Sequence, residues 1–220
     1  MNNQQALVVF LDANVLNKPA TRSLIMFAAL EDDFVVTWSQ YVEHEADRHL
    51  RSIRQLSVKK LRAKENVSIE LAPAGNDPSR FTRTSHKDQQ VLADAAASGA
   101  HFIITEDVDD FGQADLESVS IAAINPDLFL AACVSDHAYA AAVTAMAATM
   151  SNPSLTAQQL HTKLGRQHPL TVEAHRAAFE SEPMPAANRN PAVLFRGRTL
   201  EHVLNRRMMA RIRRFDRRYQ

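Results

Sequence analysis

The chain has 220 residues, of which 45% are apolar and 23% charged, and this composition excludes a disordered or fibrous protein. One cysteine, Cys133, cannot form an internal disulfide, and the first five residues lack the basic start of a secretory signal. We therefore expect a cytoplasmic protein. The alanine-rich stretch 138–151 is too short and too weakly hydrophobic to cross a bilayer, so no membrane span is expected.

A formal net charge of zero conceals a strong segregation of charge along the chain. Residues 88–136 contain ten acidic residues and no lysine or arginine. Residues 189–220 contain ten arginines against two acids, and residues 48–64 contain seven basic residues and no acid. Because local fields act on nearby partners, this separation matters more than the overall sum.

Apolar segments without helical spacing predict four buried strands, at 6–11, 34–37, 101–105 and 119–123. Helical patterns or helix-start residues lie between and after them, at 21–30, after Ser39, at 86–98 and from Pro126 onward. Strands that alternate with helices predict an α/β fold with a central parallel sheet flanked by helices. In such sheets, ligand sites lie beyond the carboxyl ends of the strands.

The pattern changes to purely helical beyond residue 150. Thr156 and Gln159 have the spacing of a capping box, and Gly165 ends the helix that follows. Near the C-terminus an apolar stripe surrounded by arginines predicts a basic amphipathic helix. We therefore divide the chain into an α/β domain of residues 1–150 and a helical C-terminal extension of residues 151–220.

Five acidic residues lie where ligand sites of α/β proteins form, that is, after a strand, at a helix start or on an early helix. They are Asp12, Glu45, Asp88, Asp107 and Asp110. Crowded carboxylates raise one another's pKa values unless cations neutralise them. Ligation by oxygen alone favours Mg²⁺ or Mn²⁺, and such ions are used by proteins to handle phosphates. The acids therefore predict a Mg²⁺ or Mn²⁺ site.

Three segments, 8–16, 39–45 and 87–111, resemble the PIN domain, the nuclease fold of the VapC-type toxins of bacterial toxin–antitoxin pairs. The resemblance covers roughly residues 6–135. In the family a serine precedes the second acid, and the same interval counted from Ser39 leads to Glu45 rather than Glu43. The match over segment 87–111 is the most specific of the three. It resembles, without a gap, the family's third acid, the helix and buried strand that follow, and the closing acidic turn. The extension resembles that of longer PIN toxins with helical C-terminal segments.

The resemblance implies a Mg²⁺-dependent endoribonuclease toxin that a cognate antitoxin protein holds inactive. It implies Asp12 as the central metal ligand, with Glu45 and Asp88 on one side, Asp107 on the other and Asp110 as an auxiliary. Two divalent ions about 4 Å apart would generate a hydroxide nucleophile and stabilise the leaving 3′ oxygen. Asn14 and Thr105, at the same strand ends, are suited to orienting a carboxylate or a phosphate.

The basic residues suggest partners. Arg48, Arg51 and Arg54 follow Glu45 outward along its helix and are candidates for an RNA path, although a plain solvated face remains an alternative. The arginine-rich stretch 206–218 could bind RNA, bind an acidic antitoxin or dock on its own domain. A homodimer is also compatible with the sequence.

Several residues have simpler alternatives. Each predicted ligand could instead cap a helix, lie on a solvated helix face or belong to a polar turn. Glu43, Asp47 and Asp94 are expected to be surface charges. Three histidines, His161, His168 and His175, recur every seven residues, but Pro169 interrupts any common helix, so they are not expected to bind metal.

Two other functions compete with the nuclease hypothesis. A phosphatase of the haloacid-dehalogenase type also places an Asp after its first strand, but it needs a second acid where Asn14 lies. A non-catalytic PIN-like scaffold would bind RNA or protein after losing its metal, yet here all four acidic positions are filled.

Overall fold

The computed structural model describes residues 6–32, 34–52, 57–64, 69–181 and 194–197. A five-stranded sheet lies at its centre, formed by β1 (Leu7–Leu11), β2 (Phe34–Thr37), β3 (Phe102–Ile104), β4 (Ala122–Ile124) and β5 (Phe195–Arg196). The strand order is β2-β1-β3-β4-β5; the first four strands are parallel, and β5 is antiparallel to β4. The predicted α/β fold with a central parallel sheet is thus confirmed. The edge strand β5 was not predicted.

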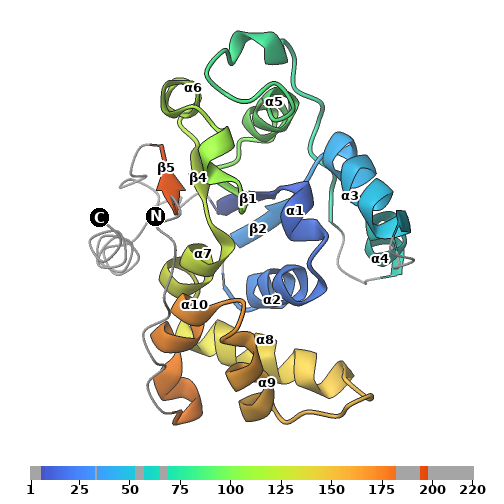
Figure 1. Cartoon of the computed structure of the whole chain (residues 1–220), viewed down its shortest axis with the longest axis vertical. Coiled ribbons are helices and arrows are strands. Elements are labelled where there is room, and N and C mark those ends of the chain that lie inside the picture. Colours follow the sequence, from blue (N-terminus) through green and yellow to red (C-terminus); the bar gives the residue numbers. More distant parts are fainter. Residues whose placement is uncertain (1–5, 33, 53–56, 65–68, 182–193, 198–220) are drawn as a thin grey trace.

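Helices surround this sheet. They are α1 (Ala13–Leu16), α2 (Pro19–Ala29), α3 (Gln40–Ser52), α4 (Val58–Lys64), α5 (Gln89–Ala97), α6 (Gln113–Ser118), α7 (Pro126–Cys133), α8 (Asp136–Thr149), α9 (Ala157–Leu164) and α10 (Pro169–Ala174). Short 3₁₀ turns occur at η1 (Pro78–Arg80), η2 (Val108–Asp110) and η3 (Arg176–Phe179). Figure 1 shows α5 and α6 at one end of the molecule and α8, α9 and α10 at the other. None of the described helices has the length and hydrophobicity needed to span a membrane.

Local side chains account for several helix boundaries. The Ser39 hydroxyl accepts a hydrogen bond from the Val42 N–H, as expected for a residue that begins α3. The predicted alanine-rich helix from Pro126 is in fact two helices, because the Ser135 hydroxyl caps a second helix by accepting from the Ala138 N–H. The capping box predicted at Thr156 and Gln159 is present at the start of α9.

The register between β1 and β3 determines where the two strands end. Leu11 pairs with Ile104, and the Asp12 N–H donates to the Ile104 carbonyl at 3.1 Å. Phe129 of α7 packs edge to face against Phe34 and Phe102, with ring centroids 5.5 and 6.0 Å apart. This aromatic packing fixes α7 against β2 and against β3, the strand that Asp107 follows.

Buried polar contacts attach the described part of the extension to the α/β core. Two N–H groups at the start of α10, those of Leu170 and Thr171, donate to the Asp127 carboxylate at 3.1 and 2.8 Å. The three histidines with seven-residue spacing make further contacts to earlier helices: His161 with Tyr139, His168 with Thr21, and His175 with Asp136 and the Leu130 carbonyl. The predicted basic terminal helix lies outside the described residues.

Three acids predicted to be surface charges are buried, so that prediction was wrong. Glu43 is ion-paired with Arg62 and accepts from the Trp38 indole. Asp47 accepts from the Val58 N–H at 2.6 Å and so connects α3 to α4. Asp94 accepts from the Gly75 N–H at 2.7 Å and holds the loop before η1 against α5. These acids are structural because each satisfies donors from another segment.

We predict that Phe129→Ala lowers the free energy of unfolding by about 3–5 kcal/mol, since it removes a fully buried ring from the aromatic packing between α7 and the sheet. Leu30→Ala is the matched control: Leu30 is 57% exposed, and we expect a change of about 0.5 kcal/mol or less. Chemical denaturation of both variants measures the difference. Equal losses in the two variants would contradict this assignment of the core.

Candidate active site

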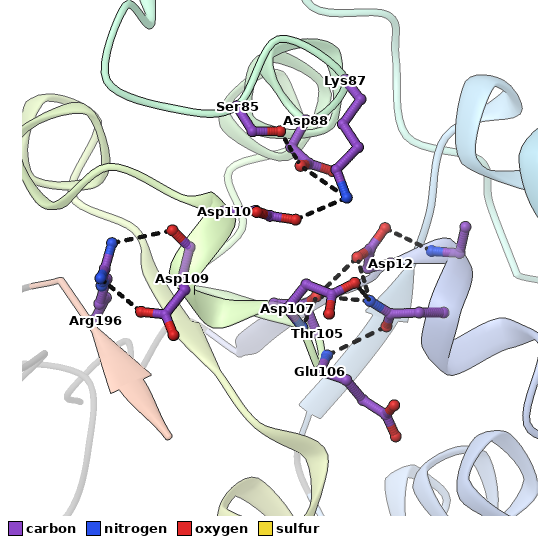
Figure 2. A network of polar contacts seen from close by, with 12 residues as sticks. Asp12, Ser85, Lys87, Asp88, Thr105, Glu106, Asp107, Asp109, Asp110 and Arg196 are labelled. Atoms are coloured by element: carbon purple, nitrogen blue, oxygen red, sulfur yellow. Dashed lines mark hydrogen bonds and ion pairs between the residues drawn. The ribbon is translucent and has the colours of Figure 1, made fainter. Parts of the chain in front are cut away.

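Asp12 lies at the centre of a hydrogen-bonded group where β1 and β3 end (Figure 2). Its Oδ1 accepts from the Ala13 N–H at 2.6 Å, and its Oδ2 accepts from the Thr105 hydroxyl at 2.8 Å. The Asn14 side-chain amide donates to Asp12 Oδ2 at 3.0 Å and to Asp107 Oδ2 at 3.2 Å. Asn14 and Thr105 therefore contact the acids they were predicted to orient, and one amide nitrogen connects Asp12 with Asp107.

Asp88 and Asp110 form a second group, in which Lys87 is the central residue. Asp88 precedes α5, and its Oδ2 accepts from the Ser85 hydroxyl at 2.6 Å. The Lys87 ammonium lies 2.7 Å from Asp110 Oδ2 and 3.9 Å from Asp88 Oδ2 (Figure 2). The sequence analysis did not identify Lys87 as a site residue. Its position next to Asp88 was the available signal, but its contact with Asp110 depends on the fold.

Glu45 is half-buried on α3 and lies within electrostatic range of both groups. The structure gives it no hydrogen bond to the other site acids among the described residues. Its negative charge nevertheless raises the pKa of both Asp12 and Asp88. The Asn14 amide thus links Asp12 with Asp107, whereas Glu45 and Asp88 are related to Asp12 through their charges alone. We refer to these four acids, which come from four separate segments of the chain, as the acidic edge.

The Asp12 carboxyl is strongly perturbed by this environment. Burial raises its pKa from 3.8 to about 7, and the charges of Asp88 and Glu45 add to the increase. Hydrogen bonds from Thr105 and Ala13 act in the opposite direction without offsetting the effect of burial. Burial also raises the pKa of Asp88. A buried carboxylate with a pKa near neutrality is typical of a functional site.

Basic side chains neutralise some of the neighbouring acids and leave others without a counterion. Each paired acid belongs to the turn that follows β3, and each base comes from another segment: Glu106 pairs with Lys18, Asp109 with Arg196 at 2.6 Å, and Asp110 with Lys87 at 2.7 Å. Within the described ranges, no lysine or arginine forms an ion pair with Asp12, Glu45 or Asp107. The site acids without a basic partner in the described part of the chain are therefore three of the predicted ligands.

These residues suit a divalent metal ion in charge and in donor chemistry. Carboxylate oxygens are the ligands that Mg²⁺ and Mn²⁺ prefer, and a cation would stabilise the ionised form of Asp12, which burial and, to a smaller extent, the charges of Asp88 and Glu45 disfavour. As the side chains lie, however, no three acidic, histidine or cysteine groups of the described chain are close enough together to hold an ion. Metal binding would require the Asn14 amide to move from between Asp12 and Asp107.

Two of the arginines predicted to bind RNA are exposed on α3. Arg48 and Arg51 both lie on the surface, and the Arg51 side chain donates to the Asp47 carbonyl at 3.2 Å. The charge of Arg48 acts on Tyr41, whose ring is 42% exposed and which also feels Glu45 and Asp88. Arg54 lies outside the described residues. Arg48 is thus an exposed basic side chain near the acidic edge, a position from which it could contact the phosphates of a bound partner.

A separate cavity of about 510 Å³ lies between α2, β2 and residues 69–73. Apolar side chains such as Met26, Phe27 and Leu71 form much of its wall, and none of the predicted site acids borders it. The acidic edge, rather than this cavity, carries the perturbed carboxylates, so it is the better candidate for chemistry.

A scan against models of protein families and searches of curated proteins and of solved structures found no match to this chain.

We predict that, without metal, the free energy of unfolding falls as pH rises from 5 to 8. The folded chain retains the Asp12 proton up to about pH 7, whereas the unfolded chain loses it near pH 4, so deprotonation disfavours folding in this range. Asp12→Asn should remove up to about 2.6 kcal/mol of this decline, since each pH unit between the two pKa values is worth about 1.4 kcal/mol. Denaturation of both proteins across this range measures it. Identical pH profiles would contradict the perturbed Asp12.

Proposed function

We propose that the chain is a Mg²⁺-dependent endoribonuclease of the PIN type that hydrolyses RNA phosphodiester bonds. The observation that carries the proposal is that Asp12, Glu45 and Asp107, at the carboxyl edge of the parallel strands, have no lysine or arginine partner among the residues that the structure describes. Three neighbouring acids have basic partners, so the absence of such partners is selective. The resemblance of segments 8–16, 39–45 and 87–111 to PIN domains supports the same conclusion.

Each site residue has a distinct task in this proposal. Asp12, Glu45, Asp88 and Asp107 would hold the metal, which, when bound, lowers the pKa of a water molecule and stabilises negative charge on the phosphate. The Thr105 hydroxyl fixes the orientation of the Asp12 carboxylate, and the Asn14 amide supports it until a metal ion takes its place. The exposed Arg48 and Arg51 would position the RNA backbone without reading its sequence.

We further propose that the nuclease is the toxin of a type II toxin–antitoxin pair. The support is the same resemblance, because the PIN domain is the nuclease fold of the VapC-type toxins. An antitoxin would inhibit the enzyme by covering the acidic edge. A basic segment of the antitoxin would complement the charge that Asp12, Glu45 and Asp107 leave uncompensated.

We predict that the purified chain cleaves structured RNA with Mg²⁺ and that EDTA abolishes this cleavage. Asp12→Asn should reduce the rate by more than about 100-fold, which exceeds the effect of most residues that only orient metal ligands. Glu106→Gln is the matched control, because this acid lies in the turn after β3 but is paired with Lys18, and its activity should be retained. Gel analysis of a labelled RNA measures the rates.

Three results would overturn the proposal. Undiminished cleavage by Asp12→Asn would show that these acids do not carry the reaction. RNA binding without cleavage, at any Mg²⁺ or Mn²⁺ concentration, would instead favour the non-catalytic scaffold. Hydrolysis of a small phosphate ester in preference to RNA would favour the phosphatase.

A further inference from the structure

We propose that His175 is a buried imidazolium cation that attaches the helical extension to the α/β core, and that its proton makes this attachment sensitive to pH. His175 is the residue at which α10 ends, and its side chain is fully buried. It lies where α10 packs against α7, and it also contacts α8. The inference is independent of the proposed nuclease, because it concerns neither the acidic edge nor a metal ion.

Both ring nitrogens of His175 face hydrogen-bond acceptors. Nδ1 lies 2.7 Å from Asp136 Oδ1, and Nε2 lies 3.0 Å from the Leu130 carbonyl oxygen. A carbonyl and an ionised carboxylate only accept, whereas a neutral imidazole has a single N–H. A neutral ring would therefore direct a lone pair at one of the two oxygens in a buried position, which is unfavourable. The imidazolium form donates to both.

The proton belongs on the ring rather than on Asp136. A protonated Asp136 that donates to a neutral ring would satisfy the same two contacts. The Asp136 side chain is 58% exposed, however, so water stabilises its ionised form. The 2.7 Å separation is also typical of a charge-assisted bond between N⁺–H and O⁻.

The surroundings of His175 favour a positive charge. His175 follows the last turn of α10, and Leu130 belongs to the last turn of α7. The C-terminal ends of helices carry negative partial charge, which stabilises a cation. The Tyr139 ring stacks on the imidazole, with the centroids 4.4 Å apart and 15° between the planes, and an aromatic face attracts a cation.

The neighbouring His161 of α9 has the opposite protonation state. Burial and, to a smaller extent, the charge of His175 lower the pKa of His161. Its ring nitrogens contact the hydroxyls of Tyr139 and Ser181, each at 3.0 Å. Hydroxyls both donate and accept, so a neutral His161 satisfies both contacts. Two buried histidines of one cluster thus differ in charge.

Other titratable groups on these elements have their own contacts or add no charge. The Asp127 carboxylate of α7 accepts from N–H groups at the start of α10, and Cys133 of α7 is a buried thiol. Glu173 of α10 lies 3.8 Å from Arg176 of η3. Asp136 is therefore the acid that directly compensates His175.

The bound proton stabilises the folded chain. An unfolded histidine loses its proton near about pH 6.5, whereas we expect His175 to retain it to higher pH. The stabilisation is complete below about pH 6.5 and is lost as the pH rises through the value at which folded His175 deprotonates. In this window the folding equilibrium constant falls by up to about tenfold per pH unit. His161 is neutral there in both states and contributes nothing.

Long-range ¹H–¹⁵N NMR of the histidine-labelled full-length chain at about pH 7 tests the charge directly, because the two ring nitrogen shifts distinguish an imidazolium from a neutral ring. We expect His175 to be an imidazolium and His161 to be neutral. Asp136→Asn should make His175 neutral, since an amide can donate to Nδ1. His137→Gln is the matched control, because His137 is the next residue of α8 and its side chain is 81% exposed.

Chemical denaturation of His175→Gln and His137→Gln from about pH 6 to 9 tests the linkage. Asp12 contributes equally to both variants, so their difference isolates His175. We expect the additional loss of stability with rising pH in His137→Gln only. Amide hydrogen exchange should show weaker protection of α10 in Asp136→Asn than in His137→Gln, with β1 and β3 unchanged.

A neutral His175 in the folded wild type at about pH 7, or the same pH profile in both glutamine variants, would overturn the inference. Equal protection of α10 in Asp136→Asn and His137→Gln would contradict the role of the charge in attaching the extension. None of these results bears on RNA cleavage, and a failure of cleavage would leave the charge of His175 intact.

Discussion

The parallel pairing of β1 with β3 is the constraint on which the acidic edge depends. Because Leu11 pairs with Ile104, the two strands end at the same level and place Asp12 beside Thr105. Parallel strands of an α/β sheet are covered by helices on both faces, so a carboxyl group at their ends is shielded from water. The raised pKa of Asp12 follows from this shielding more than from any neighbouring charge.

The folded chain redistributes charge that is segregated in the sequence. Residues 88–136 contain no lysine or arginine, yet three of their acids are paired with Lys18, Lys87 and Arg196, which come from before and after that segment. The arrangement lowers the electrostatic cost of folding a highly acidic turn. It also leaves Asp12, Glu45 and Asp107 without a basic partner in the described structure.

Sequence patterns were sufficient for the features that depend on local periodicity. Continuous apolar runs predicted β1, β2 and β3, and the acids that follow them mark the carboxyl edge. The two-residue β5 carries no periodic signal, and α6 spans only six residues, so neither was predicted. The break between α7 and α8 was signalled by Ser135, a good helix N-cap within an otherwise continuous alanine-rich segment.

The errors in the sequence analysis concern charged residues whose partners are distant in sequence. Glu43 and Asp47 are four residues apart and directly follow the buried Val42 and Ala46, so the buried face of α3 is wider than its apolar stripe. Their partners Arg62 and Val58 belong to α4. Lys87 likewise gains its significance from Asp110, twenty-three residues away. Such pairings depend on tertiary structure, and composition or spacing alone does not reveal them.

The most direct test of the account is the location of Mn²⁺ by anomalous diffraction from crystals of the full-length chain. The account predicts strong density among the carboxylates of Asp12, Glu45, Asp88 and Asp107. No bound Mn²⁺, or Mn²⁺ bound only at other acids such as Glu106 and Asp109, would contradict it.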